Sequence, residues 1–168
     1  MIKIEFARRR DAQIISEMSR DFIETGLDWR WRSGRVLRAI RNPDTSVIKA
    51  LIDSRFAGFA IMRFGREEAH LDLIAVHPAY RRQGAGLALL SWLEESALTA
   101  GISIVRLEIR ESNIGAMKFY ARQGYQQIRR VKRYYCGQET AIELARDLWC
   151  GVSINAFRND GFYKSNGR

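Results

Sequence analysis

A glycine-rich turn at residues 81–86 is the part of the chain best suited to hold a charged ligand. The turn contains Arg81, Gly84 and Gly86, follows an apolar strand and leads into a helical run that begins near Leu87. The first N–H groups of a helix have no partner within it and share the positive end of the helix dipole. Glycine also lacks the side chain that would hold a phosphate at a distance. We therefore expect a phosphate or pyrophosphate to bind here.

Two common nucleotide-binding motifs do not fit this turn. No Lys-Ser or Lys-Thr pair follows the glycines, which excludes the P-loop of nucleoside-triphosphate-binding proteins. The third glycine of a dinucleotide-binding fingerprint would fall on Leu89, and no downstream acid for a ribose stands out. The remaining pattern is Arg-x-x-Gly-x-Gly. Taken alone, this pattern leaves a tight loop without a ligand as the alternative.

A second group of polar residues lies downstream, around Glu108 and Tyr120. Residues 102–110 alternate between apolar and polar types, which predicts a strand with Glu108 on its polar face. A helix is predicted over 113–123 with Asn113 as its N-cap. Asn113 and Tyr120 are seven residues apart, so they lie on one face of this helix, two turns apart. A ligand that runs along the helix can meet both side chains.

Both stretches resemble the acyl-CoA-binding core of the GNAT N-acetyltransferases. The turn at 81–86 is similar to that family's pyrophosphate turn, and residues 107–125 are similar to its strand, Ser-Asn turn and helix ending in Tyr-x-x-x-Gly-aromatic. The resemblance covers roughly residues 71–148. It implies a single α/β domain of the α+β type over residues 1–149, with a splayed central strand pair and acetyl-CoA as the acetyl donor. Residues 150–168 are predicted to be a C-terminal tail.

The elements that must position these residues can be predicted from their patterns. They suggest a mixed, mostly antiparallel sheet of about six or seven strands with helices on both faces. The helix over 86–100 is expected to bury Leu89, Leu93, Ala97 and Ala100 on one face. Strands are predicted over 2–7, 45–52, 55–64, 67–76, 102–110, 125–135 and 139–148, and helices over 10–25, 33–41, 86–100 and 113–123.

The resemblance implies which residues bind acetyl-CoA. They belong to an interrupted strand, to the pyrophosphate turn and to the helix that follows the second strand. The backbone N–H groups of the interrupted strand are expected to polarise the thioester carbonyl. The implied residues are Ile74, Ala75, Val76, Arg81, Arg82, Gln83, Gly84, Ala85, Gly86, Leu87, Asn113 and Tyr120.

The resemblance also implies two catalytic residues. Tyr120 is expected to donate a proton to the CoA sulfur, because a phenol titrates at about 10, close to an alkyl thiol; the alternative is a tyrosine of the core. Glu108 is the candidate base, acting on the amine directly or through a water. The alternative for Glu108 is a structural salt bridge with Arg106 and Arg110, whose charges would make it a weaker base.

The acceptor amine is less well defined. Residues 128–135 and 139–141 resemble the end of ribosomal-protein-alanine N-acetyltransferases, which favours a protein N-terminus or a Lys side chain. Thr140 replaces the usual Asp of that subgroup, and residues 26–34, with two tryptophans and two arginines, differ from it. A small amine, such as a polyamine, an amino acid or an antibiotic, is therefore the alternative acceptor.

Composition limits the remaining function classes. The net charge of +9 attracts polyanions, so a non-catalytic domain that binds CoA or nucleic acid is a second hypothesis, although we see no recognition helix or stacking platform for nucleic acid. Two cysteines and two histidines without ligand spacing argue against a metal site. No signal peptide or membrane span is evident, which favours the cytoplasm. The oligomeric state stays open, with a homodimer as one alternative.

Overall fold

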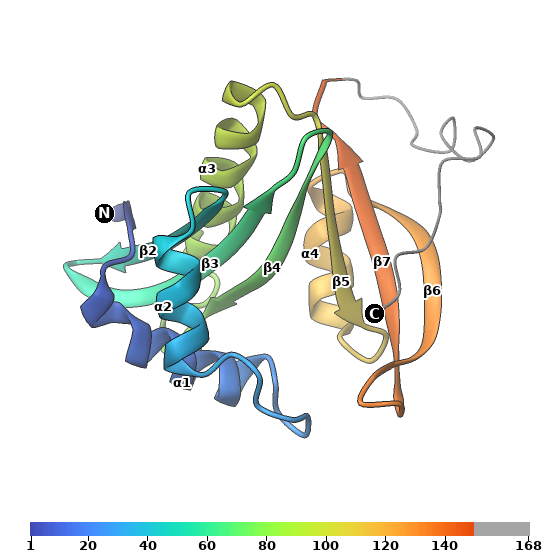
Figure 1. Ribbon diagram of the computed structural model, residues 1–168, viewed down its shortest axis with the longest axis horizontal. Helices are drawn as coiled ribbons and strands as arrows, with labels where there is room; N and C mark the ends of the chain where they lie inside the picture. Colours follow the sequence, from blue (N-terminus) through green and yellow to red (C-terminus); the bar gives the residue numbers. More distant parts are fainter. Residues whose placement is uncertain (150–168) are drawn as a thin grey trace.

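Within residues 1–149, which the computed structural model describes, seven strands form one sheet in the order β1-β2-β3-β4-β5-β7-β6 (Figure 1). The tail predicted over 150–168 lies outside these residues. Neighbouring strands are antiparallel except β4 and β5, so the predicted mixed, mostly antiparallel sheet is confirmed. The strands are β1 Ile2–Phe6, β2 Thr45–Ile52, β3 Arg55–Phe64, β4 Glu68–Val76, β5 Ile104–Arg110, β6 Gln126–Tyr135 and β7 Glu139–Asp147, and the α-helices are α1 Ala12–Phe22, α2 Ser33–Arg41, α3 Ala85–Thr99 and α4 Ile114–Arg122.

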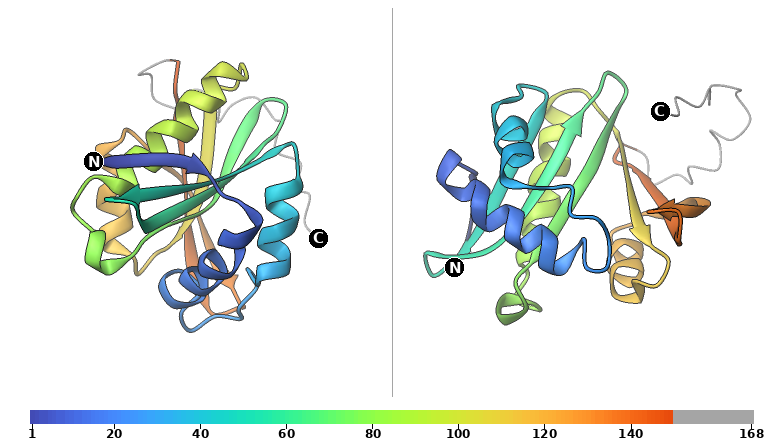
Figure 2. Two further views of the ribbon diagram at one scale, coloured as in Figure 1. Left: turned by 90° about the vertical axis from the view of Figure 1, so that its left-hand side faces the viewer. Right: turned by 60° about the horizontal axis from the view of Figure 1, so that its bottom comes forward.

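Helices cover both faces of the sheet, as predicted: α1 and α2 lie on one face, and α3 and α4 on the other (Figures 1 and 2). Successive residues of a strand point to opposite faces. In β3, Phe59 and Ile61 therefore belong to the core beneath α1 and α2, whereas Ala60 and Met62 belong to the core beneath α3. All four side chains are fully buried. The polar face of the candidate site lies on the α1–α2 side.

Most element boundaries agree with the sequence prediction. The hairpin between β2 and β3 turns at Asp53 and Ser54, both at positive φ (48° and 65°), as a two-residue turn between twisted strands requires. Gly101 and Gly124 follow the ends of α3 and α4 at φ of 79° and 84°, the left-handed conformation that ends helices.

Two details of the helices differ from the prediction. The helix predicted over 10–25 begins with a 3-10 turn, η1 (Arg9–Asp11), and α1 ends at Phe22, because the buried Glu24 carboxylate accepts the backbone N–H groups of Arg30 and Trp31 and folds the chain back. Ala100 is exposed instead of buried, because α3 stops at Thr99.

The central strands β4 and β5 are splayed, as the family resemblance implies. Residues 68–70 of β4 pair with residues 104–106 of β5, and beyond them the two strands diverge (Figure 1). The strands therefore leave two unpaired edges facing each other along most of their length.

A β-bulge interrupts β4 at Asp72. Leu71 and Leu73 pair with consecutive residues of β3, so Asp72 lies between them as an extra residue. Leu71 belongs to the core beneath α3, whereas Leu73 belongs to the core beneath α1 and α2. The interruption is predicted near Ile74 to Val76 but lies at Asp72. That prediction is wrong because Ile74 and Val76 pair regularly with β3.

Candidate active site

The glycine-rich turn forms the N-terminus of α3. Gly84 is the N-cap at φ 88°, a conformation that favours glycine. The first helical hydrogen bond runs from the Ala88 N–H to the Gly84 oxygen, and among the described residues no group accepts the N–H groups of residues 84–87. A side chain at Gly86 would meet Val76 at 3.7 Å, an ordinary contact, so packing alone does not require glycine there. This cradle fits a pyrophosphate.

Two side chains of the turn support it from within. The Arg81 Nε donates to the Val76 carbonyl oxygen at 3.1 Å, and the Gln83 Nε2 donates to the Ala79 oxygen at 3.3 Å. Arg82 adopts a left-handed φ of 63° between them. The structure therefore brings together the whole predicted turn, with Arg81 linking it to the end of β4.

The unpaired edge of β4 carries backbone donors. The His77 N–H donates to the Ala57 oxygen of β3 at 2.8 Å. Because the N–H groups of a strand alternate between its two edges, those of Ile74 and Val76 point to the edge that faces β5. Two N–H groups on such an edge can polarise a carbonyl.

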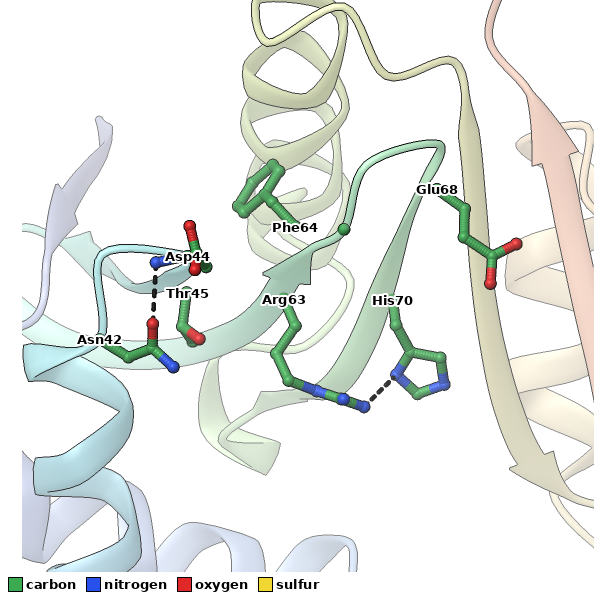
Figure 3. A pocket seen from close by; sticks show the side chains of 8 residues that line it. Asn42, Asp44, Thr45, Arg63, Phe64, Glu68 and His70 are labelled. Carbon is green, nitrogen blue, oxygen red and sulfur yellow. Dashed lines mark hydrogen bonds between the residues drawn. The ribbon is translucent and has the colours of Figure 1, made fainter. Parts of the chain in front are cut away.

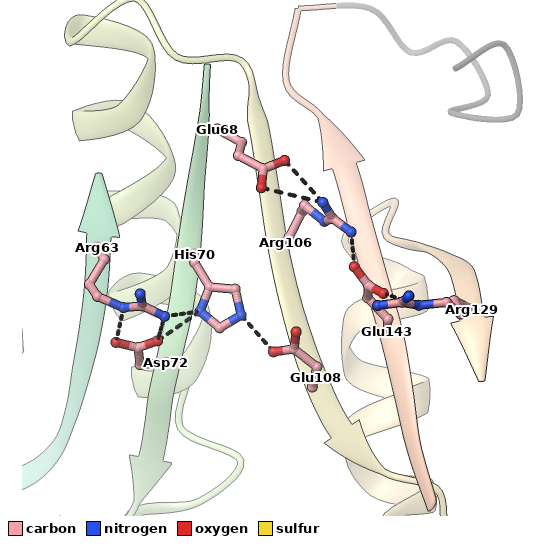
Figure 4. Close-up of polar contacts among 8 residues, drawn as sticks. All are labelled: Arg63, Glu68, His70, Asp72, Arg106, Glu108, Arg129 and Glu143. Atoms are coloured by element: carbon pink, nitrogen blue, oxygen red, sulfur yellow. Dashed lines mark hydrogen bonds and ion pairs between the residues drawn. The ribbon is translucent and has the colours of Figure 1, made fainter. Parts of the chain in front are cut away.

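Glu108 lies on β5 with its side chain on the α1–α2 face. Its neighbours Leu107 and Ile109 are buried on the opposite face, as the alternation predicts. The Glu108 Oε2 lies 2.6 Å from the Nε2 of His70, across the point where β4 and β5 part (Figure 4). Its Oε1 makes no hydrogen bond to any residue in 1–149.

The two arginines beside Glu108 serve other partners. Arg106 pairs with Glu68 of β4 and with Glu143 of β7 (Figure 4). Arg110 donates to the backbone oxygens of Ile23 at 3.1 Å and Thr25 at 2.6 Å, in the loop that follows α1. Glu108 is thus bonded to a histidine instead of forming the salt bridge with Arg106 and Arg110 that we considered as the alternative.

His70 continues the contact into a chain across three strands. Its Nδ1 lies 2.7 Å from Asp72 Oδ1, and Arg63 of β3 holds both Asp72 oxygens at 2.7 Å (Figure 4). Burial lowers the pKa of His70, but the hydrogen bonds to Asp72 and Glu108 outweigh it and raise the pKa from 6.5 to about 9. His70 is therefore an imidazolium at neutral pH.

Sequence reasoning missed His70. The only signal was a run of polar residues, Glu68, His70 and Asp72, at alternate positions of the strand. Glu108 is 38 residues away, and the register of β4 against β5 brings the two side chains together.

Tyr120 lies deeper than its predicted role suggests. Its side chain is buried, and its ring packs against Phe119 at 5.1 Å and Tyr125 at 5.3 Å. Burial, and then the Glu94 carboxylate, raise the pKa of Tyr120 far above its usual value. The expected match with the pKa of a thiol is therefore wrong, and Tyr120 remains a protonated hydrogen-bond donor. Asn113 caps α4 as predicted, with its Oδ1 accepting the Ala116 N–H at 3.0 Å.

A cavity of about 260 Å³ adjoins His70 on the α1–α2 face (Figure 3). Its wall carries the carboxylates of Asp44 and Glu68 together with the Arg63 guanidinium. The cavity is lined by Asn42, Asp44, Thr45, Arg63, Phe64, Gly65, Glu68 and His70.

Tyr134 of β6 lies close to the carboxylates of Glu108 and Asp72. Burial of its phenol, and then these two carboxylates, raise the pKa of Tyr134.

Comparison with known proteins agrees with this geometry. The sequence profile described as the Acetyltransferase (GNAT) family matches residues 9–125. The chain belongs to this family. The GNAT match includes the turn before α3, the splayed strands and α4.

Three relatives illustrate the range of the similarity. The [ribosomal protein bS18]-alanine N-acetyltransferase of Salmonella typhimurium is 37% identical over 101 residues, which are 58% of this chain and 68% of that protein. The N-terminal acetyltransferase B complex catalytic subunit NAA20 of Arabidopsis thaliana is 38% identical over 80 residues, 47% of this chain and 46% of that protein. The crystal structure of the ribosomal-protein-S18-alanine N-acetyltransferase from Escherichia coli superposes with a TM-score of 0.74 and 27% identity, covering 88% of this chain and 94% of the other.

None of the helices among residues 1–149 combines the length and the apolar character that crossing a membrane would require.

Proposed function

We propose that this chain transfers the acetyl group of acetyl-CoA to the α-amine of a protein N-terminus. Membership of the GNAT family supports acetyl transfer, and the two relatives named for protein N-terminal acetylation support that acceptor. The observation that carries the proposal is the position of Glu108. It stands on the unpaired edge of β5, facing the unpaired edge of β4, with one oxygen bound by His70 and the other unbonded among the described residues.

The turn before α3 would hold the donor. The N–H groups of Ala85, Gly86 and Leu87 suit its pyrophosphate, and the Asn113 amide at the start of α4 suits the arm beyond it. Acetyl-CoA supplies the acetyl thioester. The remaining chemistry belongs to residues of the chain.

Each step of direct transfer has a residue to serve it. The N–H groups of Ile74 and Val76 would stabilise the negative charge that develops on the carbonyl oxygen. Glu108 would take a proton from the ammonium, so that the neutral amine attacks. Tyr120 would donate a hydrogen bond to the departing sulfur, since its raised pKa keeps it protonated. The thiolate would then take up the second proton, which the attacking nitrogen loses as the C–S bond breaks.

The acceptor would enter from the α1–α2 face. The Glu108 Oε1 on this face, which no described residue binds, would accept the ammonium group, and Tyr134 offers an aromatic wall beside it. A peptide can extend from this point between the loop after α1 and the β6–β7 hairpin, which Arg110 and Glu139 border. We propose the cytoplasm as the location, where newly made protein N-termini and acetyl-CoA meet.

A panel of acceptors tests the proposal. Peptides with a free α-amine, the same peptides with a blocked N-terminus and one Lys, and small amines are each incubated with acetyl-CoA, and thiol release is followed. We expect turnover on free α-amines and at most slow turnover on the blocked peptides. Faster turnover on a polyamine, amino acid or antibiotic would replace the protein N-terminus by a small-molecule acceptor.

A further inference from the structure

The chain Arg63–Asp72–His70–Glu108 links three strands on the acceptor face (Figure 4). We infer that His70 is a positioning residue for the reaction: held by Asp72 and Arg63, it binds one oxygen of Glu108 and leaves the other for the acceptor amine. This inference rests on the proposed function of Glu108 as the base.

The contacts fix the His70 ring and, through it, one oxygen of Glu108. His70 approaches Oε2 at 2.6 Å, while its other nitrogen is fixed by Asp72 at 2.7 Å, so the ring cannot turn without breaking one contact. Asp72 in turn accepts hydrogen bonds from the Nε and the Nη2 of Arg63, and this bidentate pair fixes the orientation of the carboxylate. The bulge in β4 marks Asp72 as the extra residue of the strand, where it can meet His70 and Arg63 together. A base held this firmly does not need to be ordered by the substrate.

Charge balance gives His70 a second effect on Glu108. Both ring nitrogens face carboxylates, and a ring that carries two protons donates to Asp72 and Glu108 at once. The Arg63 Nη2, which lies 3.2 Å from Nδ1, then shares Asp72 with the ring. The other charged groups around the chain are Arg63 on β3, Glu68 on β4 with its partner Arg106 on β5, and the Tyr134 phenol from β6. The imidazolium therefore separates the carboxylates of Asp72 and Glu108, which would otherwise face each other as like charges.

The proton balance of the step is simple. An N–H bond of the acceptor ammonium breaks, and an O–H bond forms at Glu108 Oε1. The Nε2–H of His70 remains in place as a hydrogen-bond donor to Oε2 throughout. When the His70 ring loses one of its two protons, the nitrogen that loses it turns a lone pair toward a carboxylate oxygen at 2.6 or 2.7 Å, so the contacts that position Glu108 must rearrange. Activity should therefore decline on the alkaline side as His70 titrates.

Nuclear magnetic resonance of the imidazole nitrogens tests the arrangement without any turnover. The chain has two histidines, and a His77→Asn variant leaves His70 as the single signal. We expect His70 to titrate at about 9 in this variant, and to titrate at least about one pH unit lower when Glu108→Gln or Asp72→Asn is added. A midpoint near that of a free imidazole, or one that neither change moves, would overturn the inference.

Kinetics then test whether His70 acts through Glu108. His70→Gln retains a hydrogen-bond donor but has no titratable ring. We expect kcat to fall by roughly 10- to 100-fold, with an unchanged KM for acetyl-CoA. The decline in rate at alkaline pH that comes from His70 should be absent from the pH–rate profile of this variant. In a Glu108→Gln background the same change should lower kcat almost no further, because both substitutions disable the same pair, His70 and Glu108. An equal loss in both backgrounds would show a merely structural role. If the parent protein acetylates no amine, the proposed function fails, while the resonance titration still decides the charge chain.

Discussion

The charge on His70 should make the stability of the protein fall as the pH rises through the alkaline range. Its pKa in the folded protein is about 9, above the 6.5 of an unperturbed imidazole. Between these values the folded state holds a proton that the unfolded state has lost, so stability decreases with pH. The contribution of the protonated His70 to the free energy of unfolding is complete below about pH 6.5 and is lost as the pH rises through about 9.

The size of the effect follows from the shift. A difference of 9 − 6.5 = 2.5 pH units corresponds to about 3 kcal/mol of unfolding free energy, since one unit is about 1.4 kcal/mol. Only 29% of the His70 side chain is exposed, so solvent weakens its two ion pairs little. That loss is a large share of the stability of a typical domain.

Urea denaturation, followed by tryptophan fluorescence, measures the effect between about pH 6 and about pH 9, where few unfolded tyrosines ionise. The parent protein and the His77→Asn variant should lose about 3 kcal/mol over this range, whereas His70→Gln should lose much less. A parent protein with constant stability over the range, or a His70→Gln variant with the same slope, would refute the reasoning.

Four further substitutions test other parts of the site. Gly84→Ala should lower stability by about 1–2 kcal/mol, because an L-residue is strained at its φ of 88°, whereas Gly86→Ala should spare stability and weaken acetyl-CoA binding in calorimetry. Glu24→Ala should destabilise by about 2–5 kcal/mol in denaturant titration, because it leaves the buried N–H groups of the loop before α2 unpaired; a loss below 1 kcal/mol would contradict this. Arg110→Ala should raise the KM for the peptide acceptor and leave the KM for acetyl-CoA unchanged, since it frees the loop after α1; an equal rise in both would argue against that role.

The sequence predicts those parts of the fold that local signals determine. The hairpin at Asp53 and Ser54 and the helix ends at Gly101 and Gly124 follow from turn chemistry that a few residues specify. The alternation around Glu108 predicts its strand and its exposed face because a half-buried strand has a period of two.

The remaining features depend on contacts between distant segments. The early end of α1 depends on the Glu24 carboxylate, which binds backbone groups beyond the following turn. The pairing of His70 with Glu108 depends on the register of a parallel strand pair joined through α3, and no local pattern sets that register. The raised pKa of Tyr120 is likewise a consequence of burial by the assembled core, which spacing along one helix does not reveal.

The most direct test of the account compares the parent protein with Glu108→Gln on one free α-amine peptide, with acetyl-CoA binding measured by calorimetry on both. The account predicts equal binding of acetyl-CoA, addition of one acetyl group at the peptide α-amine by the parent protein, and a rate roughly 10²- to 10⁴-fold lower for Glu108→Gln. Equal rates for the two proteins, or no response of either to acetyl-CoA, would contradict it.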